Sequence, residues 1–211
     1  ADSASDKKIK SIILENFPDH DIHSEEGDIH NHSDYLWAID PLDGTINYSR
    51  KIDDYCVSIA VEHKGEIIIG VIYEPYCNHL FVAEKEKGAF MNNKRISVSK
   101  EDKMINMLLA TDNSTSHMKF RIKNYTILKN ICHEVRQIRI LGAGAVHMTK
   151  VAKGDIDLYF KTKYNHWDYA AGVLLIEEAG GKVTDFEGNK ITKESVGIVA
   201  SNGKVHKEFL D

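Results

Sequence analysis

The sequence predicts a mixed α/β layered sandwich, and three features of the chain support this fold class. Residues 55–90 alternate apolar and polar side chains between turns, as expected of antiparallel strands that bury one face. Beyond residue 111, short apolar runs alternate with segments of helical spacing, which favours helices packed against a second sheet. The 211 residues, 42% of them hydrophobic, can bury a full core, either as one large domain or as two lobes that share a sheet.

The first half of the chain is expected to hold one helix followed by strands. The helix begins at Ser3 or Ser5 as N-cap and ends before Pro18, because apolar residues recur between them at helical intervals. Segment 19–34 is polar and carries four histidines, but no spacing fixes a fourfold metal-ligand set, so it is interpreted as a solvated loop. The strands that follow are expected at an apolar run ending in Ile39 and at 56–62, 66–74, 79–84 and 94–99.

The second half alternates between the two kinds of element. Helices are expected at 116–133, 145–152, 168–179 and 204–210, and strands at 107–111, 135–141, 156–160, 182–185 and 197–201. We therefore expect a single unit over 1–211, with an N-terminal lobe at 1–110 that contains the meander and a C-terminal α/β lobe at 111–211.

Composition narrows the range of functions. A net charge of −5 argues against a surface that binds a nucleic-acid polymer. The longest apolar runs, such as 67–73, are too short to cross a bilayer, and no secretory signal opens the chain. Three cysteines without Cys-x-x-Cys spacing favour a reducing, cytoplasmic setting over a disulfide framework.

The segment Asp40-Pro41-Leu42-Asp43-Gly44-Thr45 follows the buried strand that ends in Ile39. Hard divalent cations prefer oxygen ligands, which the two carboxylates and the Leu42 carbonyl, exposed by the bend at Pro41, can supply. Gly44 and Thr45 open a short helix whose free N–H groups favour an anion. Cation and anion sites side by side indicate phosphate chemistry, although an Asp-x-x-Asp pair alone also fits a capped strand end.

Two further motifs strengthen this interpretation. Ser24-Glu25-Glu26-Gly27 lies upstream, and Trp167-Asp168-Tyr169-Ala170-Ala171-Gly172 heads a long apolar segment downstream. In this order and spacing, the three motifs resemble those of the inositol monophosphatase family, part of a superfamily with fructose-1,6-bisphosphatases and bisphosphate nucleotidases. The resemblance covers essentially the whole chain. It implies αβαβα layering, a homodimer, and a further helix before Ala1 that is either absent or trimmed.

The resemblance also implies the metal ligands. Glu25, Asp40 and the Leu42 carbonyl would hold a first Mg²⁺, and Asp40, Asp43 and Asp168 a second, with Glu25 reaching a weaker third ion. Asp168 also fits a plain helix N-cap. Glu26 is interpreted as a salt-bridge or outer-shell partner rather than as a ligand.

Catalytic and substrate-binding roles follow from the same resemblance. The Thr45 hydroxyl would lie beside the attacking water, and Asp2 would form a hydrogen bond with this hydroxyl. Glu25 would assist catalysis through its bound metal ion. The Gly44 and Thr45 N–H groups would bind phosphate, and Gly144 would touch the sugar ring. The expected activity is Mg²⁺-dependent hydrolysis of a small phosphate monoester, such as inositol monophosphate, by metal-activated water.

Lys161 is the main departure from the family pattern. Inositol-specific members have a glutamate at this position that binds ring hydroxyls, whereas an ammonium suits an anion. Fructose-1,6-bisphosphate or a 3′,5′-bisphosphonucleoside therefore stays open as substrate, and an exposed strand-end charge is the plain alternative for Lys161. A rival of another class is a non-catalytic metal-binding protein of the same fold.

Overall fold

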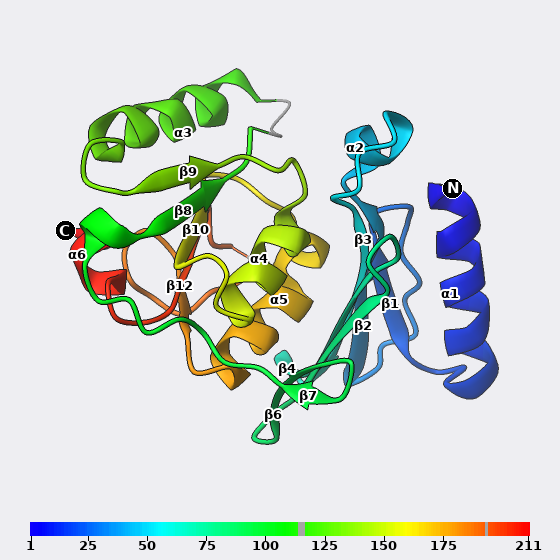
Figure 1. The fold of residues 1–211 in the computed structure, drawn as a ribbon. Helices are drawn as coiled ribbons and strands as arrows, with labels where there is room; N and C mark the ends of the chain where they lie inside the picture. Colours follow the sequence, from blue (N-terminus) through cyan, green and yellow to red (C-terminus); the bar gives the residue numbers. More distant parts are fainter. Residues whose placement is uncertain (114–116, 193) are drawn as a thin grey trace.

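Helices and sheets alternate in five layers in this computed structural model, which describes residues 1–113, 117–192 and 194–211 (Figure 1). Helix α1 (Asp2–Asn16) covers the outer face of the first sheet. Helices α4 (Gly144–Ala152) and α5 (His166–Glu178) lie between the two sheets. Helices α3 (Met118–Ile131) and α6 (His206–Leu210) cover the second sheet. The predicted αβαβα sandwich is confirmed.

The first sheet has its described strands in sequence order from β1 to β7. Strands β1 and β2 are parallel, and every later neighbouring pair is antiparallel, so the predicted meander is confirmed. The strands are β1 (Asp21–Ser24), β2 (Tyr35–Asp43), β3 (Cys56–His63), β4 (Glu66–Glu74), β5 (His79–Glu84), β6 (Gly88–Met91) and β7 (Lys94–Arg95).

The structure corrects three expectations in this half of the chain. Segment 19–34 is not a plain loop, because β1 adds to the sheet edge with Ile22 fully buried. The expected strand at 94–99 stops at Arg95, and the chain then leaves the sheet, with the Val98 N–H donating to the Ala179 carbonyl. Helix α1 starts at Asp2 with Ala1 as its N-cap, so neither Ser3 nor Ser5 caps it.

The second sheet has the order β11-β12-β10-β8-β9 in the described part of the chain. Strand β8 is parallel to β9 and β10, while β12 is antiparallel to β10 and β11. The strands are β8 (Leu108–Thr111), β9 (Gln137–Arg139), β10 (Leu158–Lys161), β11 (Lys182–Thr184) and β12 (Ile198–Ser201), and a 3₁₀ turn, η1, covers Met104–Asn106. Each of these five strands lies within or close to its predicted range. Residue 116, the expected start of the third helix, lies outside the described residues.

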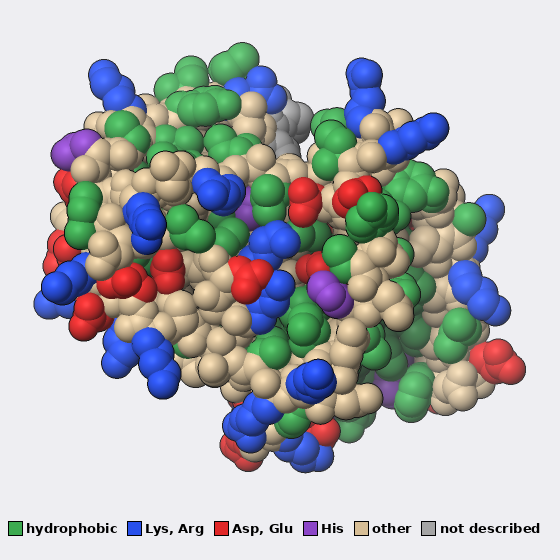
Figure 2. Space-filling view, in the orientation of Figure 1, with side chains coloured by type: hydrophobic (Ala, Val, Ile, Leu, Met, Phe, Trp, Pro, Cys, Tyr) green, Lys and Arg blue, Asp and Glu red, His purple; other side chains and the backbone are tan. Residues whose placement is uncertain are grey.

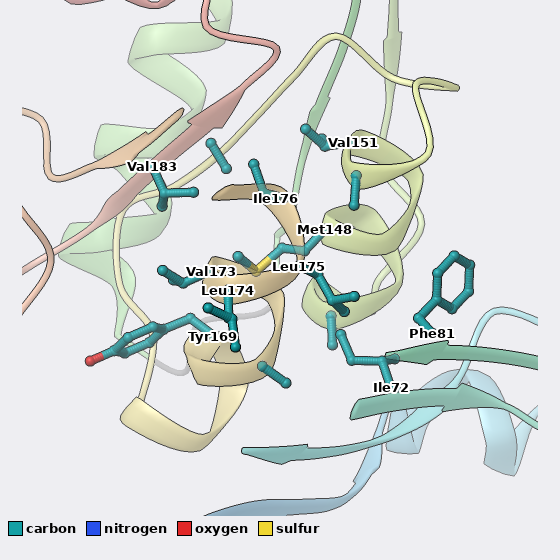
Figure 3. Close-up of a cluster of buried hydrophobic side chains, with 14 of the residues drawn as sticks. Ile72, Phe81, Met148, Val151, Tyr169, Val173, Leu174, Leu175, Ile176 and Val183 are labelled. Atoms are coloured by element: carbon teal, nitrogen blue, oxygen red, sulfur yellow. The ribbon is translucent and has the colours of Figure 1, made fainter. Parts of the chain in front are cut away.

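Buried apolar clusters hold the layers together. The cluster between the sheets joins α4 and α5 to β4 and β5: Met148 of α4 lies over α5, and Ile72 and Phe81 approach from the sheet (Figure 3). A second cluster packs α3 and α6 on the second sheet, and a third packs α1 on β1 and β2. Because residues 169–176 of α5 are all buried, close packing holds this helix in a fixed position between the two sheets.

The face of the molecule drawn in Figure 2 carries mixed charges and an apolar stripe over α3. Figure 2 shows basic and acidic side chains interspersed on one face, with hydrophobic side chains gathered over α3. Met118, Ile122 and Tyr125 on that helix are 63%, 59% and 45% exposed. Within the described ranges, no helix combines the length and the apolar character needed to span a membrane.

Candidate metal centre

The Asp-Pro-Leu-Asp segment forms an irregularity at the end of β2. Asp40 pairs with Ser58 of β3 and Asp43 with Cys56, and the register shifts between them. Proline has no N–H to give to the ladder, so the pairing breaks there and the two carboxylates are re-aimed. The Asp40 Oδ1 accepts a hydrogen bond of 3.0 Å from the Leu42 N–H, which fixes the turn.

Gly44 allows the chain to turn from β2 into the short helix α2 (Thr45–Ser49). Its φ of 84° lies in the left-handed region, and a Cβ there would lie 2.8 Å from the Asp54 carbonyl oxygen. Thr45 is the first residue of the helix, and its hydroxyl donates to the Leu42 carbonyl at 3.0 Å. The turn thus groups the Leu42 carbonyl, the Thr45 hydroxyl and the Asp43 carboxylate.

Asp168 lies at the third position of α5 rather than at its cap. The helix begins at His166 with Asn165 as N-cap, and the Asp168 Oδ2 accepts a 2.9 Å hydrogen bond from the Asn165 N–H. The prediction that Asp168 is the N-cap is therefore wrong, because Asn165 occupies that position. The Asp168 carboxylate nevertheless accepts a hydrogen bond from the backbone N–H of the cap residue. This contact holds the carboxylate at the start of the helix.

The predicted acidic ligands come together at this point. Burial, followed by the negative charges of Asp168 and other neighbouring acids, raises the pKa of Glu25 to about 7. Burial and the charges of Asp43, Asp168 and Glu25 raise the pKa of Asp40 well above its usual value. The pKa of Asp43 rises to about 6 through burial, against the lowering effect of Lys161. We refer to Glu25, Asp40, Asp43 and Asp168 as the acid cluster.

The acid cluster fits a divalent cation. Glu25, Asp40 and Asp43 are harder to ionise here than in water, and a nearby positive charge would favour their ionised forms. Carboxylate and carbonyl oxygens are the donors that Mg²⁺ takes, and Glu25, Asp40, Asp43, Asp168 and the Leu42 carbonyl are of that type. The donor set thus suits the hard cation that the sequence predicts.

Asp43 is held from two further elements. The Ala145 N–H, at the start of α4, donates to its Oδ2 at 2.7 Å. The buried thiol of Cys56 lies 3.8 Å from the same oxygen. Gly144 precedes Ala145, so the expected sugar-contact position adjoins the acid cluster.

Asp2 and Glu26 lie at the edge of the acid cluster. Burial and the charge of Glu26 raise the pKa of Asp2, and its Oδ1 is buried without a hydrogen-bond partner in the described structure. The Glu26 Oε2 accepts a 3.1 Å hydrogen bond from the Ser3 hydroxyl, and its role as a partner rather than a ligand stays a prediction. The Thr45 hydroxyl donates to Leu42, so its predicted contact with Asp2 stays a prediction.

Lys161 is not an exposed strand-end charge. Its side chain is only 13% exposed, and its Nζ lies 3.8 Å from the Asp168 Oδ2. Burial acts to lower the pKa of Lys161, but Asp168, Asp112 and Asp43 outweigh it and raise the pKa above the usual value. A charged lysine therefore stands among the predicted metal ligands.

Sequence reasoning missed a buried network behind Lys161. The Asp112 carboxylate accepts a 2.8 Å hydrogen bond from the Tyr159 hydroxyl and lies 3.2 Å from the His147 Nδ1. Burial acts to raise the pKa of Asp112, but His147, Lys161 and Tyr159 lower it to about 2. Asp112 follows a strand like many loop acids, so no pattern in the sequence distinguishes it.

This network borders the Gly144 position as well. A Cβ placed on Gly144 would lie 3.1 Å from the Tyr159 hydroxyl oxygen, 3.4 Å from the Asp112 Oδ2 and 3.7 Å from the Lys161 Nζ. The predicted substrate residues Gly144 and Lys161 are therefore neighbours, on α4 and β10 respectively. Together with Asp168 they frame one side of the acid cluster.

Comparison with known proteins agrees with this architecture. The chain is 36% identical over 209 residues to the fructose-1,6-bisphosphatase/inositol-1-monophosphatase of Thermotoga maritima, covering 99% of this chain and 79% of that protein. It is 34% identical to the Nus factor SuhB of Pasteurella multocida, covering 100% of this chain and 79% of that protein. The solved inositol monophosphatase of Anabaena matches with a TM-score of 0.93 and 36% identity, covering 100% of this chain and 84% of that structure.

The match extends to the family as a whole. The sequence model of the inositol monophosphatase family matches residues 1–210, which is nearly every residue of this sequence. The ordered motifs, the five layers and the acid cluster agree with that match. The chain belongs to the inositol monophosphatase family.

Proposed function

We propose that this protein is a Mg²⁺-dependent phosphomonoesterase that hydrolyses a small phosphate ester. The observation that carries the proposal is the convergence of Glu25, Asp40, Asp43 and Asp168, where burial and neighbouring negative charges raise the pKa of Glu25 to about 7 and that of Asp43 to about 6. Such a group of acids is costly in a folded protein unless a cation uses it. Membership of a family named for a phosphatase supports the same activity.

Each residue of the centre has a proposed task. The acid cluster and the Leu42 carbonyl would hold two or three Mg²⁺ ions, and Asp40 would serve as a ligand shared by the first two. When bound, Mg²⁺ supplies a water of lowered pKa and neutralises charge on the phosphate.

Other groups of the chain position the reactants. The Thr45 hydroxyl, 3.0 Å from the Leu42 carbonyl, would orient the attacking water, and Asp2, on α1, would support Thr45. The N–H groups of Gly44 and Thr45 donate to the phosphate oxygens. Because α4 fixes Asp43 through the Ala145 N–H, the cluster keeps its geometry while substrates exchange.

The proposed substrate is inositol monophosphate or a related sugar phosphate. Gly144 contacts the sugar, and Lys161 contacts a second anionic group where the substrate has one. Fructose-1,6-bisphosphate is the first alternative, since the Thermotoga relative carries both enzyme names. A 3′,5′-bisphosphate nucleotide is the next.

The test is a phosphate-release assay on the metal-stripped protein, titrated with Mg²⁺. Comparison of kcat/KM for inositol-1-phosphate, fructose-1,6-bisphosphate and adenosine 3′,5′-bisphosphate ranks the substrates. Asp40→Asn serves as the inactive reference, and Asp34→Asn, an exposed acid outside the centre, as the matched control. If no substrate released phosphate while Mg²⁺ still bound, the non-catalytic metal-binding alternative would replace the proposal.

Three organisational properties are also proposed. We expect one phosphatase unit over 1–211 with lobes at 1–110 and 111–211, a homodimer in solution, and a cytoplasmic setting. The three free cysteines, Cys56, Cys77 and Cys132, support a reducing compartment. Light scattering that gave a monomer mass would exclude the dimer.

A further inference from the structure

A second group of metal-ligating side chains lies at the turn between β4 and β5, on a different part of the meander. Glu74 ends β4, His79 begins β5 and faces Glu74 in register, and Cys77 lies on the turn between them. One ligand atom from each of these residues lies within 4.8 Å of the others. The spacing Glu-x-x-Cys-x-His therefore brings a carboxylate, a thiol and an imidazole together.

The contact between Glu74 and His79 is longer than a typical hydrogen bond and is compatible with two ligands of one metal ion. The Glu74 Oε2 and His79 Nδ1 are 3.4 Å apart. An N–H···O hydrogen bond has its mode at about 2.9–3.0 Å. Two ligands at about 2.0–2.1 Å from one tetrahedral Zn²⁺ stand about 3.3–3.4 Å apart. The His79 Nδ1 is buried and makes no hydrogen bond to the part of the chain that the structure describes.

Glu74 is already oriented for such a role. Its side chain is 8% exposed, and its Oε1 accepts a 2.6 Å hydrogen bond from the Thr149 hydroxyl on α4. Outer hydrogen bonds of this kind fix the direction of a ligating carboxylate and leave its second oxygen for the metal. Cys77 is exposed, so rotation of its side chain can bring the sulfur closer to the other two donors.

We propose that Glu74, Cys77 and His79 form a site for a borderline-soft divalent metal such as Zn²⁺, with a water completing the tetrahedron. Thiolate and imidazole suit Zn²⁺ and exclude Mg²⁺, which takes oxygen donors. The site is therefore chemically distinct from the acid cluster. Binding removes the proton of the Cys77 thiol, which is released to solvent.

The bound metal would clamp the β4–β5 hairpin and, through Thr149, fasten it to α4. Helix α4 begins beside Asp43, so the clamp supports the element that positions this acid. A metal that binds only the folded chain raises the free energy of unfolding in proportion to the logarithm of its concentration over Kd. The site would thus be a structural staple at the turn between two interior strands of the first sheet.

Cobalt substitution tests the proposal without any assay of activity. The full-length, reduced protein is stripped of metal and given excess Mg²⁺ to occupy the acid cluster, and Co²⁺ is then titrated. We expect one equivalent of Co²⁺ to give a thiolate-to-cobalt charge-transfer band in the near ultraviolet and intense tetrahedral visible bands. Zn²⁺ is expected to displace the Co²⁺ and abolish both.

Variants identify the ligands. Cys77→Ser is expected to remove the charge-transfer band, and His79→Gln to weaken Co²⁺ binding by more than about 10–100-fold, the range produced by loss of an outer-shell partner. Cys132→Ser, which changes the other exposed cysteine, and His133→Gln are the matched controls and are expected to bind normally. Thermal melting checks that each variant folds.

Two results would overturn the site. One is a Co²⁺ spectrum that lacks the charge-transfer band in the folded, reduced protein. The other is a band that survives Cys77→Ser or disappears with Cys132→Ser, since the sulfur would then come from elsewhere. Neither result bears on phosphate release at the acid cluster, so this proposal and the proposed function fail separately.

Discussion

The Lys161 ammonium on β10 lies 3.8 Å from the Asp168 carboxylate on α5, so a lysine forms an ion pair with a proposed metal ligand. The same lysine acts to lower the pKa of Asp43. It thus supplies part of the positive charge that the acid cluster needs. The positive charge of Lys161 has two effects that can be measured separately. It repels a bound cation, and it can contact an anionic group of a substrate.

Lys161→Met is expected to tighten Mg²⁺ binding while it weakens the use of substrates with two phosphates. Removal of a repulsion of about 1 kcal/mol, the scale of a charge pair about 4 Å apart in water, lowers the Mg²⁺ concentration for half-maximal activity about fivefold. The ratio of kcat/KM for fructose-1,6-bisphosphate to that for inositol-1-phosphate should fall. Lys163→Met is the control on the same segment, and an unchanged ratio in Lys161→Met would exclude the anion contact.

Asp40→Asn and Thr45→Ala are expected to reduce kcat to different extents. Thr45 is proposed to assist the attacking water, a contribution that is typically worth about 10²–10⁴-fold. Asp40 is proposed to be shared between two ions, so its loss should cost more than that of Thr45 and should also remove the Mg²⁺-dependent rise in Tm. Steady-state kinetics and melting curves with and without Mg²⁺ measure both. Equal losses in the two variants would contradict the shared-ligand role.

The pH dependence of metal stabilisation follows from the raised pKa values of the acid cluster. Glu25 has a pKa of about 7 in the folded protein and Asp43 one of about 6, against ordinary values of 4.5 and 3.8. At pH values between the ordinary pKa and the raised pKa of each acid, the folded, metal-free chain binds more protons than the unfolded chain. Its free energy of unfolding therefore falls as pH rises from the ordinary values through the folded ones.

Mg²⁺ must displace those protons, so it is expected to raise Tm more at about pH 8 than at about pH 5. The rise in Tm on adding Mg²⁺ is the right measure, rather than Tm itself, because buried His206 gives the stability of the metal-free protein a pH dependence of the opposite sign. Burial lowers the pKa of His206 to about 4, so its contribution to stability is lost as pH falls below 6.5. A Mg²⁺ increment that was the same at both pH values would show that the carboxylates of the acid cluster are not the ligands.

Much of the fold could be predicted because its patterns are local. Apolar and polar residues alternate clearly along the meander, and α5 coincides with a long apolar run, so the predicted bounds of both lie within a few residues of the observed ones. Strand β1 was missed because Ile22 and Ile29 are isolated apolar side chains in a polar segment, and the burial of Ile22 depends on pairing with β2 and on its bridge to Ile29. The short extent of β7 likewise reflects tertiary contact, since Val98 bonds to Ala179 instead of to a strand.

The candidate site likewise has residues that local motifs predict and residues that only tertiary contacts bring together. Glu25, Asp40, Asp43 and Asp168 were identified by the motifs, and the structure places them around one point. The burial of Lys161 and the Asp112–His147–Tyr159 network could not be predicted, because each depends on residues from β8, α4 and β10 meeting across the interior. The pairing of Glu74 with His79 was also hidden, since a hairpin register decides it.

Gly70→Ala is expected to destabilise the protein by forcing β4 away from α5. A Cβ on Gly70 would lie 2.7 Å from the Ala171 carbonyl oxygen, and this neighbour is backbone within a buried helix, so it cannot rotate aside. Overpacking of this kind costs about 1–3 kcal/mol of the free energy of unfolding, measured by urea denaturation. Because α5 carries Asp168, the Mg²⁺ concentration for half-maximal activity should rise as well. A variant with unchanged stability would show that the sheet and the helix can separate freely, and that the position of Asp168 does not depend on this contact.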